Sequence, residues 1–212
     1  MWAYIKDNKI EQIYQRPKSL VLGEVRYPSN MFTKYTDAEK AAIGIYPVED
    51  SGTKGDDRFE YTSQATYTWS ASDKKVTTSY TITEKSLVDI EAKDEDGNNI
   101  LDEKGNKTYT YGLKTQAKNL AKQQANSYIK QFNWLVERSI YDSSKAIPDA
   151  VKTYVAAIKT DCTEIETAID SASDMTAFKA LYQDTFNSDG SVKEIARINR
   201  WSDDYDVQQY VR

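Results

Sequence analysis

The side chains best suited to chemistry in this sequence are carboxylates that occur in pairs. Asp56 and Asp57 are adjacent, Asp203 and Asp204 are adjacent, and further acids lie between residues 89 and 103. A glycosidase needs two carboxyl groups whose pKa values are driven apart by different surroundings, one of them usually apolar. No apolar segment beside these pairs predicts such a cleft. We therefore interpret the pairs as solvated acidic surface rather than as catalytic residues.

Calcium binding is the second chemistry that the acids suggest, because two similar turns occupy residues 94–98 and 102–106. Asp94, Asp96 and Asn98 stand at alternate positions, as calcium-binding oxygens often do. The EF-hand pattern is not met, since the glycine stands in the wrong place and no glutamate follows at the twelfth position. Both segments match Asx and glycine turns between extended arms. We predict turns there and no metal site, with calcium binding as the alternative.

Nucleophilic and imidazole chemistry is limited by composition. The 212 residues include no histidine, and Cys162 is the single cysteine. A Ser-His-Asp triad, a Cys-His pair and a histidine metal ligand are therefore excluded. No P-loop and no GxGxxG motif occurs. Cys162 stands among apolar residues at helical spacing, which is typical of a small buried side chain rather than a nucleophile. We predict a protein without catalytic residues and without cofactors.

Aromatic residues offer a further candidate surface. Between residues 58 and 84 they alternate with polar residues, which predicts strands with one exposed face. Tyrosine and tryptophan rings stack on sugars, so these strands form a candidate platform for a glycan or for a partner protein. The simpler interpretation, which we favour, is that such side chains suit half-exposed strands. The candidate residues are Tyr61, Tyr67, Trp69 and Tyr80.

The clearest element that could position any of these residues is an amphipathic helix over residues 147–171. Pro148 suits its first turn, and Asp149 meets the positive end of the helix dipole. Apolar residues recur at alternating spacings of four and three, the period of helices that pack along other helices. We call them the apolar seam: Val151, Val155, Ile158, Cys162, Ile165 and Ile169.

A second helix is predicted from Leu113 to about Tyr141. Its stripe includes Tyr128, Phe132 and Leu135, and it is widened by further apolar residues: Leu120, Ile129 and Val136. Because residues 142–146 make a short connection, the two helices are expected to lie antiparallel. The width of the stripe predicts that each helix contacts more than one partner. We therefore assign both stripes to helix packing or to contacts in an oligomer.

The first 48 residues predict a small α+β module that serves for attachment. Hairpins are expected around residues 7–9 and 23–24. Thr36 and Glu39 form a capping-box pair at the start of a short helix, and Gly44 ends it. A linker over residues 49–57 is expected to separate this module from β-rich strands and turns that extend to residue 112.

The C-terminal part, residues 113–212, is predicted to add short helices to the hairpin. Asp174 is expected to cap one of them, and a turn over residues 187–190 follows it. A last short amphipathic piece reaches Trp201, and the polar residues 202–212 are expected to form an arm outside the core. The sequence as a whole thus predicts the α+β class, with a β-rich N-terminal part and a C-terminal antiparallel helical hairpin.

Charge and hydropathy exclude further classes of protein. The net charge is −5, whereas nucleic-acid binders normally present a basic face. No apolar run approaches the ~20 residues that span a bilayer, and the first residues do not resemble a signal peptide. We expect a soluble protein that binds neither nucleic acid nor a membrane.

Three segments of the N-terminal module carry a family resemblance. They are residues 13–18 (IYQRPK), 27–32 (YPSNMF) and 41–48 (AAIGIYPV). They resemble the N-terminal module of small tail-associated proteins of tailed bacteriophages, especially of marine cyanophages.

The second half is similar to the same group and to the C-terminal region of tail-fibre assembly proteins. The segments that carry this likeness are residues 112–115, 132–138, 147–151 and 154–159. Three positions depart from the tail-fibre assembly pattern. Val155 and Lys159 stand where arginine is common, and Trp201 is followed by serine instead of proline.

The resemblance implies a non-enzymatic structural component of a virion, in the tail, fibre or baseplate region, made in the host cytoplasm. Its expected partners are other phage tail or fibre proteins and further copies of itself, for which we consider a trimer. A tail-fibre assembly chaperone is the alternative. A glycan-binding protein that recognises the host is a more remote one.

Overall fold

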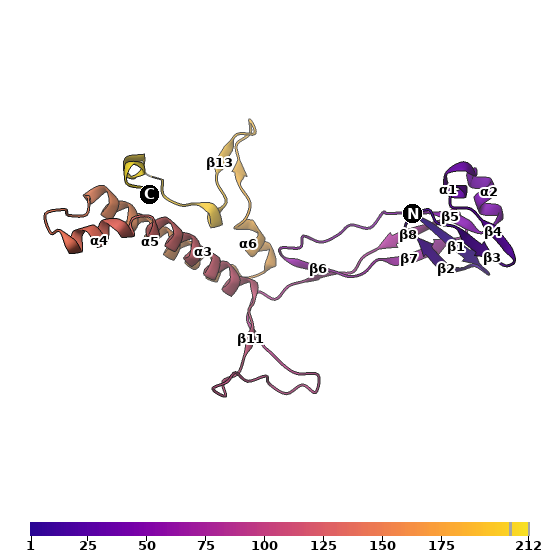
Figure 1. The fold of residues 1–212 in the computed structure, drawn as a ribbon, viewed down its shortest axis with the longest axis horizontal. Helices are drawn as coiled ribbons and strands as arrows, with labels where there is room; N and C mark the ends of the chain where they lie inside the picture. The colour runs from indigo at the N-terminus through magenta and orange to yellow at the C-terminus, as the bar shows by residue number, and fades with distance from the viewer. Residues whose placement is uncertain (204, 212) are drawn as a thin grey trace. The chain divides into compact units, whose positions relative to one another are not determined.

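The computed structural model describes residues 1–203 and 205–211 of the chain. The chain divides into two compact units, Met1–Thr83 and Glu84–Arg212, which we call the N-terminal unit and the C-terminal unit. Most of the strands belong to the first and the long helices belong to the second, so the α+β class is confirmed (Figure 1).

The N-terminal unit is built on a five-stranded sheet in the order β2-β1-β5-β8-β7. The strands are β1 (Trp2–Lys6), β2 (Lys9–Tyr14), β5 (Ile45–Glu49), β7 (Thr66–Ser70) and β8 (Lys75–Ser79). Neighbours are antiparallel except β5 and β8, which are parallel. The first predicted hairpin is confirmed, with Asp7 and Asn8 at positive φ as a tight two-residue turn requires.

The division expected at residues 48 and 49 is wrong. Because β5 pairs with β8, strands from the first two predicted parts share one sheet. Residues 50–57 form a loop within the N-terminal unit, although their composition resembles a linker. The boundary expected at residues 112 and 113 also fails, since residues 84–112 belong to the unit that holds the long helices. There, the Ser86 carbonyl accepts a hydrogen bond from Leu113 N at 2.9 Å.

One face of the sheet is covered by the segment between β2 and β5. That segment contains the second predicted hairpin, β3 (Leu20–Leu22) with β4 (Val25–Tyr27), and the helices α1 (Met31–Lys34) and α2 (Asp37–Ala42). The capping box at α2 is confirmed. Side chains of this covering segment and of the sheet form one buried cluster: Tyr14, Leu20, Met31, Phe32 and Ile45.

The opposite face of the sheet curls around a second cluster that contains Ala3, Val48 and Val76. The curl brings β7 to the β1–β2 turn, where the indole N–H of Trp69 donates to Asn8 Oδ1 at 2.9 Å. A separate two-stranded ribbon pairs β6 (Glu60–Thr62) with β9 (Ile82–Glu84).

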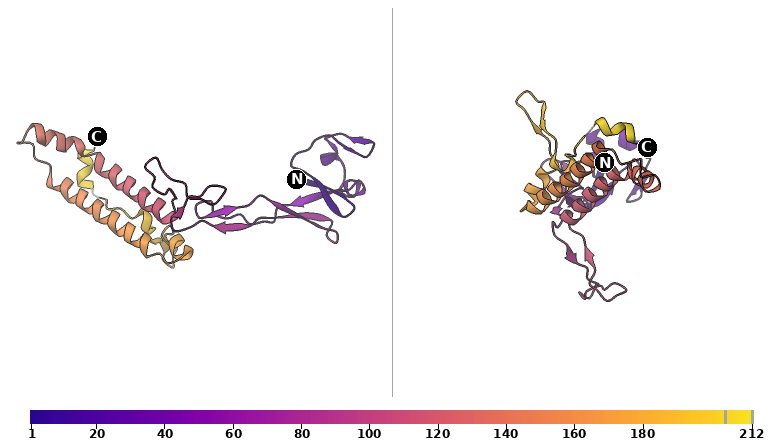
Figure 2. Two further views of the ribbon diagram at one scale, coloured as in Figure 1. Left: turned by 90° about the horizontal axis from the view of Figure 1, so that it is seen from below. Right: turned by 90° about the vertical axis from the view of Figure 1, so that its left-hand side faces the viewer.

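The C-terminal unit contains the predicted antiparallel hairpin, made by α3 (Leu113–Lys130) and α5 (Asp149–Ser171) (Figure 2). Two ion pairs of 2.8 Å, Lys118–Asp170 and Lys122–Glu166, fix the relative level of these helices. Antiparallel packing also sets the Phe132 ring 5.7 Å from the ring of Tyr154.

The second predicted helix is not continuous, and this is a correction. It ends at Lys130, and α4 (Asn133–Tyr141) follows. At the break Phe132 N donates to the Ile129 carbonyl three residues back, a tighter turn than an α-helix makes. Phe132 at the break and Leu135 after it are both buried against α5, so the break keeps the stripe directed at its partner.

The residues that follow α5 differ in part from the expectation. Helix α6 (Met175–Ala180) is present, and Asp174 caps it by accepting from Ala177 N at 2.8 Å. The predicted amphipathic piece is wrong as a single element. It is divided between β13 (Val192–Glu194), which pairs with β12 (Thr185–Phe186), and a 3₁₀ turn, η1 (Arg197–Asn199).

The polar tail is not the arm that the sequence predicts. It packs on the hairpin through the 3₁₀ segment η2 (Tyr205–Tyr210), in which Val207 is only 1% exposed. The indole N–H of Trp134 donates to the Tyr210 carbonyl at 3.0 Å. Sequence periodicity could not reveal this contact, because a single apolar anchor in a short 3₁₀ segment makes no period. We call residues 197–203 and 205–211 the C-terminal segment.

Candidate functional site

The residues of the apolar seam on α5 pack within the chain. All but one of the predicted seam residues are buried, as are Phe132 and Leu135 on the facing stripe. Val155 is the exception and is half-buried. Tyr128 is on the edge of the stripe, where its partly exposed ring lies 5.5 Å from that of Trp201.

Sequence reasoning missed Tyr154, which is buried on the flank of the seam and contacts Phe132. Its spacing of three from Val151 and four from Ile158 was a usable signal.

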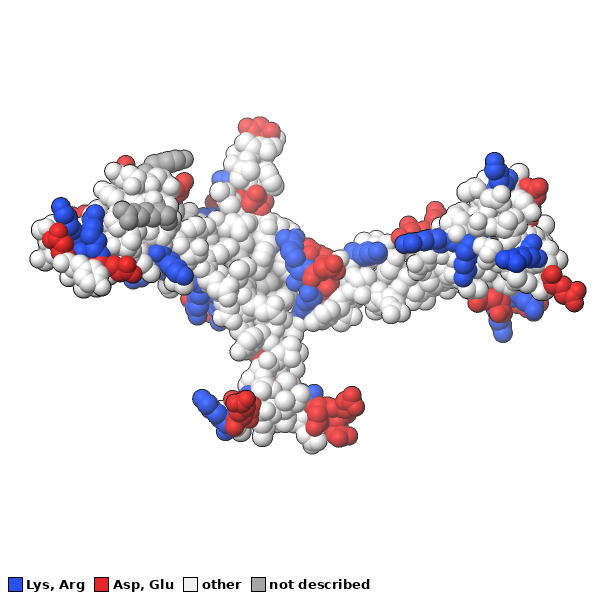
Figure 3. Space-filling view, viewed as in Figure 1, with Lys and Arg blue, Asp and Glu red and all other residues white. Residues whose placement is uncertain are grey.

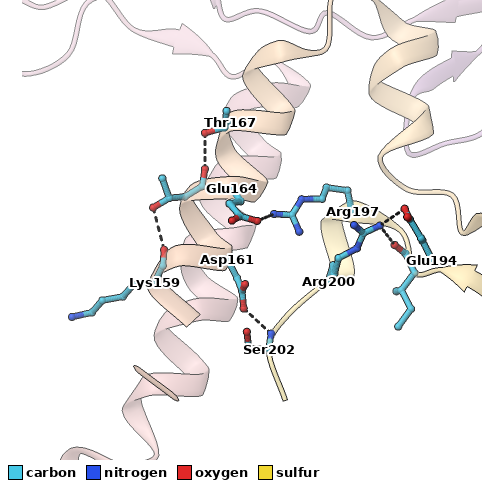
Figure 4. A network of polar contacts seen from close by, with 10 residues as sticks. Lys159, Asp161, Glu164, Thr167, Glu194, Arg197, Arg200 and Ser202 are labelled. Atoms are coloured by element: carbon cyan, nitrogen blue, oxygen red, sulfur yellow. Dashed lines mark hydrogen bonds and ion pairs between the residues drawn. The ribbon is translucent and has the colours of Figure 1, made fainter. Parts of the chain in front are cut away.

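The C-terminal segment covers one flank of α5. Asp161 Oδ2 accepts from Ser202 N at 2.6 Å, and Glu164 pairs with Arg197 at 2.7 Å. Figure 4 shows these bonds joining the helix to the segment beside it. Positions 161 and 164 are three apart and therefore share a helix face. The flank of α5 that carries Val155 and Lys159 points elsewhere.

A groove opens on that other flank, between α5 and the two helices α3 and α4. Its floor includes Phe132 and Val151, and the half-buried Val155 lies on the α5 side. A second hollow adjoins it at Ile129, and Cys162 lies in it. We call the two together the hairpin groove. Its remaining lining residues are Lys122, Ala125, Asn126, Asn133, Val136, Ile147, Lys152, Lys159, Thr163 and Glu166.

The charges along the hairpin groove are mainly lysines. Lys122 pairs with Glu166, whose hydrogen bond raises the pKa of the lysine. Lys152 pairs with Asp149 at 2.8 Å. Lys159 has no ion pair among the described residues, and in Figure 4 its side chain extends away from the polar network. Burial raises the pKa of the Cys162 thiol, which keeps it protonated and unreactive at neutral pH.

Exposed apolar side chains continue from the groove to the end of the hairpin. Val136 is 45% exposed, Ile140 is 74% exposed and Tyr141 is 91% exposed. Val136 and Ile140 are four residues apart on α4 and share a face. The sequence predicts an apolar stripe on this helix that is wide enough for more than one partner. In the structure that stripe ends in exposed apolar surface on α4.

The predicted Asx turns lie on an arm that starts with β10 (Ile90–Glu91) and returns with β11 (Tyr109–Thr110), and they are confirmed. Asp94 Oδ1 accepts from the backbone N–H of Asn98 at 2.8 Å, and Asp102 Oδ1 from that of Asn106 at 2.8 Å. These bonds lower the pKa values of both aspartates. The carboxylates serve the backbone of their own turns.

The arm closes its backbone in an unusual ring. Ala92 N donates to the Thr108 carbonyl, Thr108 N to the Ile100 carbonyl, and Ile100 N to the Ala92 carbonyl, each at 2.9 Å. The two-stranded stem and two short hairpins therefore meet at one point, and the turns of the two hairpins hold the charges. Figure 3 shows acids and lysines gathered at the outer turns of the arm and mostly uncharged surface along its stem.

The other predicted acids do not converge. Asp56 binds the Arg58 guanidinium at 2.7 Å. Asp203 is exposed, and Asp204 lies outside the described residues. Within residues 1–203 and 205–211, no group of three cysteine or acidic residues is placed to hold a metal ion.

The four candidate aromatic residues do not share one platform. Tyr67 and Trp69 pack against Val76 on the inner face of the curled sheet. Tyr80 packs between the loop residues 50–54, where Lys54 lies over its ring. Tyr61, on β6, is the exposed member. Three of these rings are therefore used for packing within the N-terminal unit.

No protein-family model, curated protein or solved structure matches this chain. None of the helices in the described ranges is both long and apolar enough to cross a membrane.

Proposed function

We propose that this protein is a non-enzymatic structural component of a bacteriophage virion, located in the tail, fibre or baseplate region, and that it acts through protein–protein contacts. The observation that carries the proposal is the hairpin groove, whose apolar lining continues into the exposed side chains of Val136 and Ile140. Contiguous exposed apolar surface is a feature of protein-binding sites.

The phage setting is supported by the segments that resemble tail-associated proteins. Within the N-terminal unit these segments supply buried residues, among them Met31, Phe32 and Ile45. Residues of a core are the ones that a shared fold retains, because their volumes must fit together. The resemblance therefore concerns the part of the N-terminal unit that determines its fold.

Mass spectrometry of purified particles of the phage that encodes this chain tests the proposal. We expect the protein at a fixed copy number, retained after gradient purification. A particle that lacks it would overturn the structural role. A chaperone for fibre assembly would instead be bound to fibre in infected-cell lysate, with few or no copies in the particle. Copy number therefore separates the two functions.

A further inference from the structure

We propose that the hairpin groove is where two copies of this chain join, related by a two-fold axis that runs along the helices. This inference rests on the proposed function, because it names the face through which the structural protein associates with further copies of itself. The resulting core would be a four-helix bundle in which every neighbour is antiparallel: each copy supplies α5 as one rod, and α3 continued by α4 as the other.

Among the described residues, the helical hairpin is covered on one flank only. The C-terminal segment occupies one flank of α5 through the bonds of Asp161 and Glu164. The flank that carries Val155 and Lys159 faces the groove. A two-helix layer whose second flank is lined by apolar residues is stabilised by a further layer of helices.

Both walls of the groove are lined by residues at helical spacing. On the α3–α4 wall the lining residues step by four, three, four and three: Lys122, Asn126, Ile129, Asn133 and Val136. On the α5 wall they step by three, four and three: Lys152, Val155, Lys159 and Cys162. This is the period at which helices pack along one another, so each wall is suited to a helix as its partner.

The charges on the two walls favour a second copy as the occupant. A two-fold axis along the helices sets the α3–α4 wall of one copy against the α5 wall of the other. Because such an axis involves no shift along the helices, residues that lie level within one chain also lie level between the two copies. Lys122 then faces Glu166 of the second copy, since these residues lie level with each other in the hairpin. Glu137, exposed beside Val136, comes within one helical turn of Lys152 of the second copy. Opposite charges thus meet at both ends, and between them Ile129 and Val155 lie together with the polar side chains of Asn126, Asn133 and Lys159.

The test measures the mass of the full-length protein by sedimentation velocity and light scattering, over concentrations that reach the millimolar level. We expect a dimer. Val136→Glu, which places a charge in the groove, should raise the dimer dissociation constant roughly tenfold or more. Leu120→Glu is the matched control, because Leu120 is similarly exposed at 47% but does not line the groove. It should leave the dissociation constant unchanged, and circular dichroism of both variants confirms folding.

A charge exchange makes the geometry specific. Glu137→Lys alone should weaken the dimer, and combining it with Lys152→Glu should restore it. A pairing that is lost in Leu120→Glu but persists in Val136→Glu would contradict the proposal, as would a trimer. A chain that stays monomeric in vitro yet is found in purified particles would overturn the pairing and leave the structural role intact. A dimer that depends on the groove but is missing from purified particles would support the pairing and overturn the structural role.

Discussion

Helix α5 and the arm over residues 90–110 are segments of similar length in the same unit, yet they are ordered by different forces. In α5 the residues Ile158, Ile165 and Ile169 are completely buried. In the arm every residue from 93 to 107 is exposed, and its shape depends on hydrogen bonds among its own backbone and two aspartates. Burial couples α5 to the rest of its unit, whereas the arm is stabilised only by contacts within itself.

This difference predicts opposite responses to substitution. A charge placed in α5 affects every segment that shares its core, because apolar burial is the main source of stability there. The loss of a turn aspartate in the arm affects only the few residues that the aspartate holds. Local opening and global unfolding are separable in such a protein.

The largest effect is expected for Ile158→Asp and for Ile165→Asp. Each places an unpaired charge where no solvent reaches, which costs roughly 3–5 kcal/mol of unfolding free energy. Urea denaturation followed by the helical circular dichroism signal measures the loss. Ala156→Asp, on the exposed side of the same helix, is the control. Equal midpoints for the three variants would remove the distinction between α5 and the arm.

A smaller effect is expected for Val207→Asp, which attacks the anchor of the C-terminal segment. The charge costs about 1–3 kcal/mol at that site, because the short segment can detach and carry the charge into water. Limited proteolysis should then cut the chain after Trp201 while the helical hairpin survives. Gln208→Asp, at an exposed neighbouring position, should resist cleavage as the native chain does. A resistant Val207→Asp variant would mean that the segment needs no anchor.

A local effect without a global one is expected in the arm. Asp94→Ala combined with Asp102→Ala removes the acceptors of both turns, so exchange of the Asn98 and Asn106 amide protons should accelerate roughly tenfold. The midpoint of urea unfolding should not move. Asp96→Ala, in the same turn as Asp94, is the matched control, and hydrogen-exchange mass spectrometry is the measurement. A shifted midpoint would show that the arm contributes to the core after all.

The smallest effect is the response of the arm to acid. The pKa values of Asp94 and Asp102 are lowered in the folded arm, chiefly by the backbone hydrogen bonds of Asn98 and Asn106. Their contribution to order is therefore complete above the unfolded pKa of about 3.9 and is lost as pH falls through the lower folded value. Nuclear magnetic resonance should show the turn amides broadening only below about pH 4, with the α5 resonances unchanged. Broadening that begins near neutral pH would require another titrating group.

The elements that local sequence determines could be predicted. The apolar seam of α5, the tight turn at Asp7 and Asn8, the capping box at Thr36 and the cap at Asp174 all follow from neighbours within a few residues. The parallel pairing of β5 with β8 could not be predicted, because it joins segments far apart in the sequence and depends on a register that no local pattern encodes. The docking of Val207 could not be predicted either, because a single apolar anchor in a short segment makes no period.

The candidate site could be predicted only in part. The sequence marks both helices of the hairpin as apolar along one stripe, and it includes Phe132 and Val155 among the contact residues. Which flank stays open depends on where the C-terminal segment lies, and that is set by single contacts such as Asp161 with Ser202. The position of the lysines along the groove could not be predicted, because the sequence does not distinguish them from other exposed lysines on a helix.

The parallel pair β5–β8 also has a consequence for the order of events during synthesis. The β1–β2 and β7–β8 hairpins close over short loops, whereas β5 can join β8 only after the chain between them has been made. Contacts that are distant in sequence close slowly, because the intervening chain must first lose its freedom. A nascent chain that has not yet emerged from the ribosome beyond Ser79 therefore exposes the edge of β5, and its sheet is completed last.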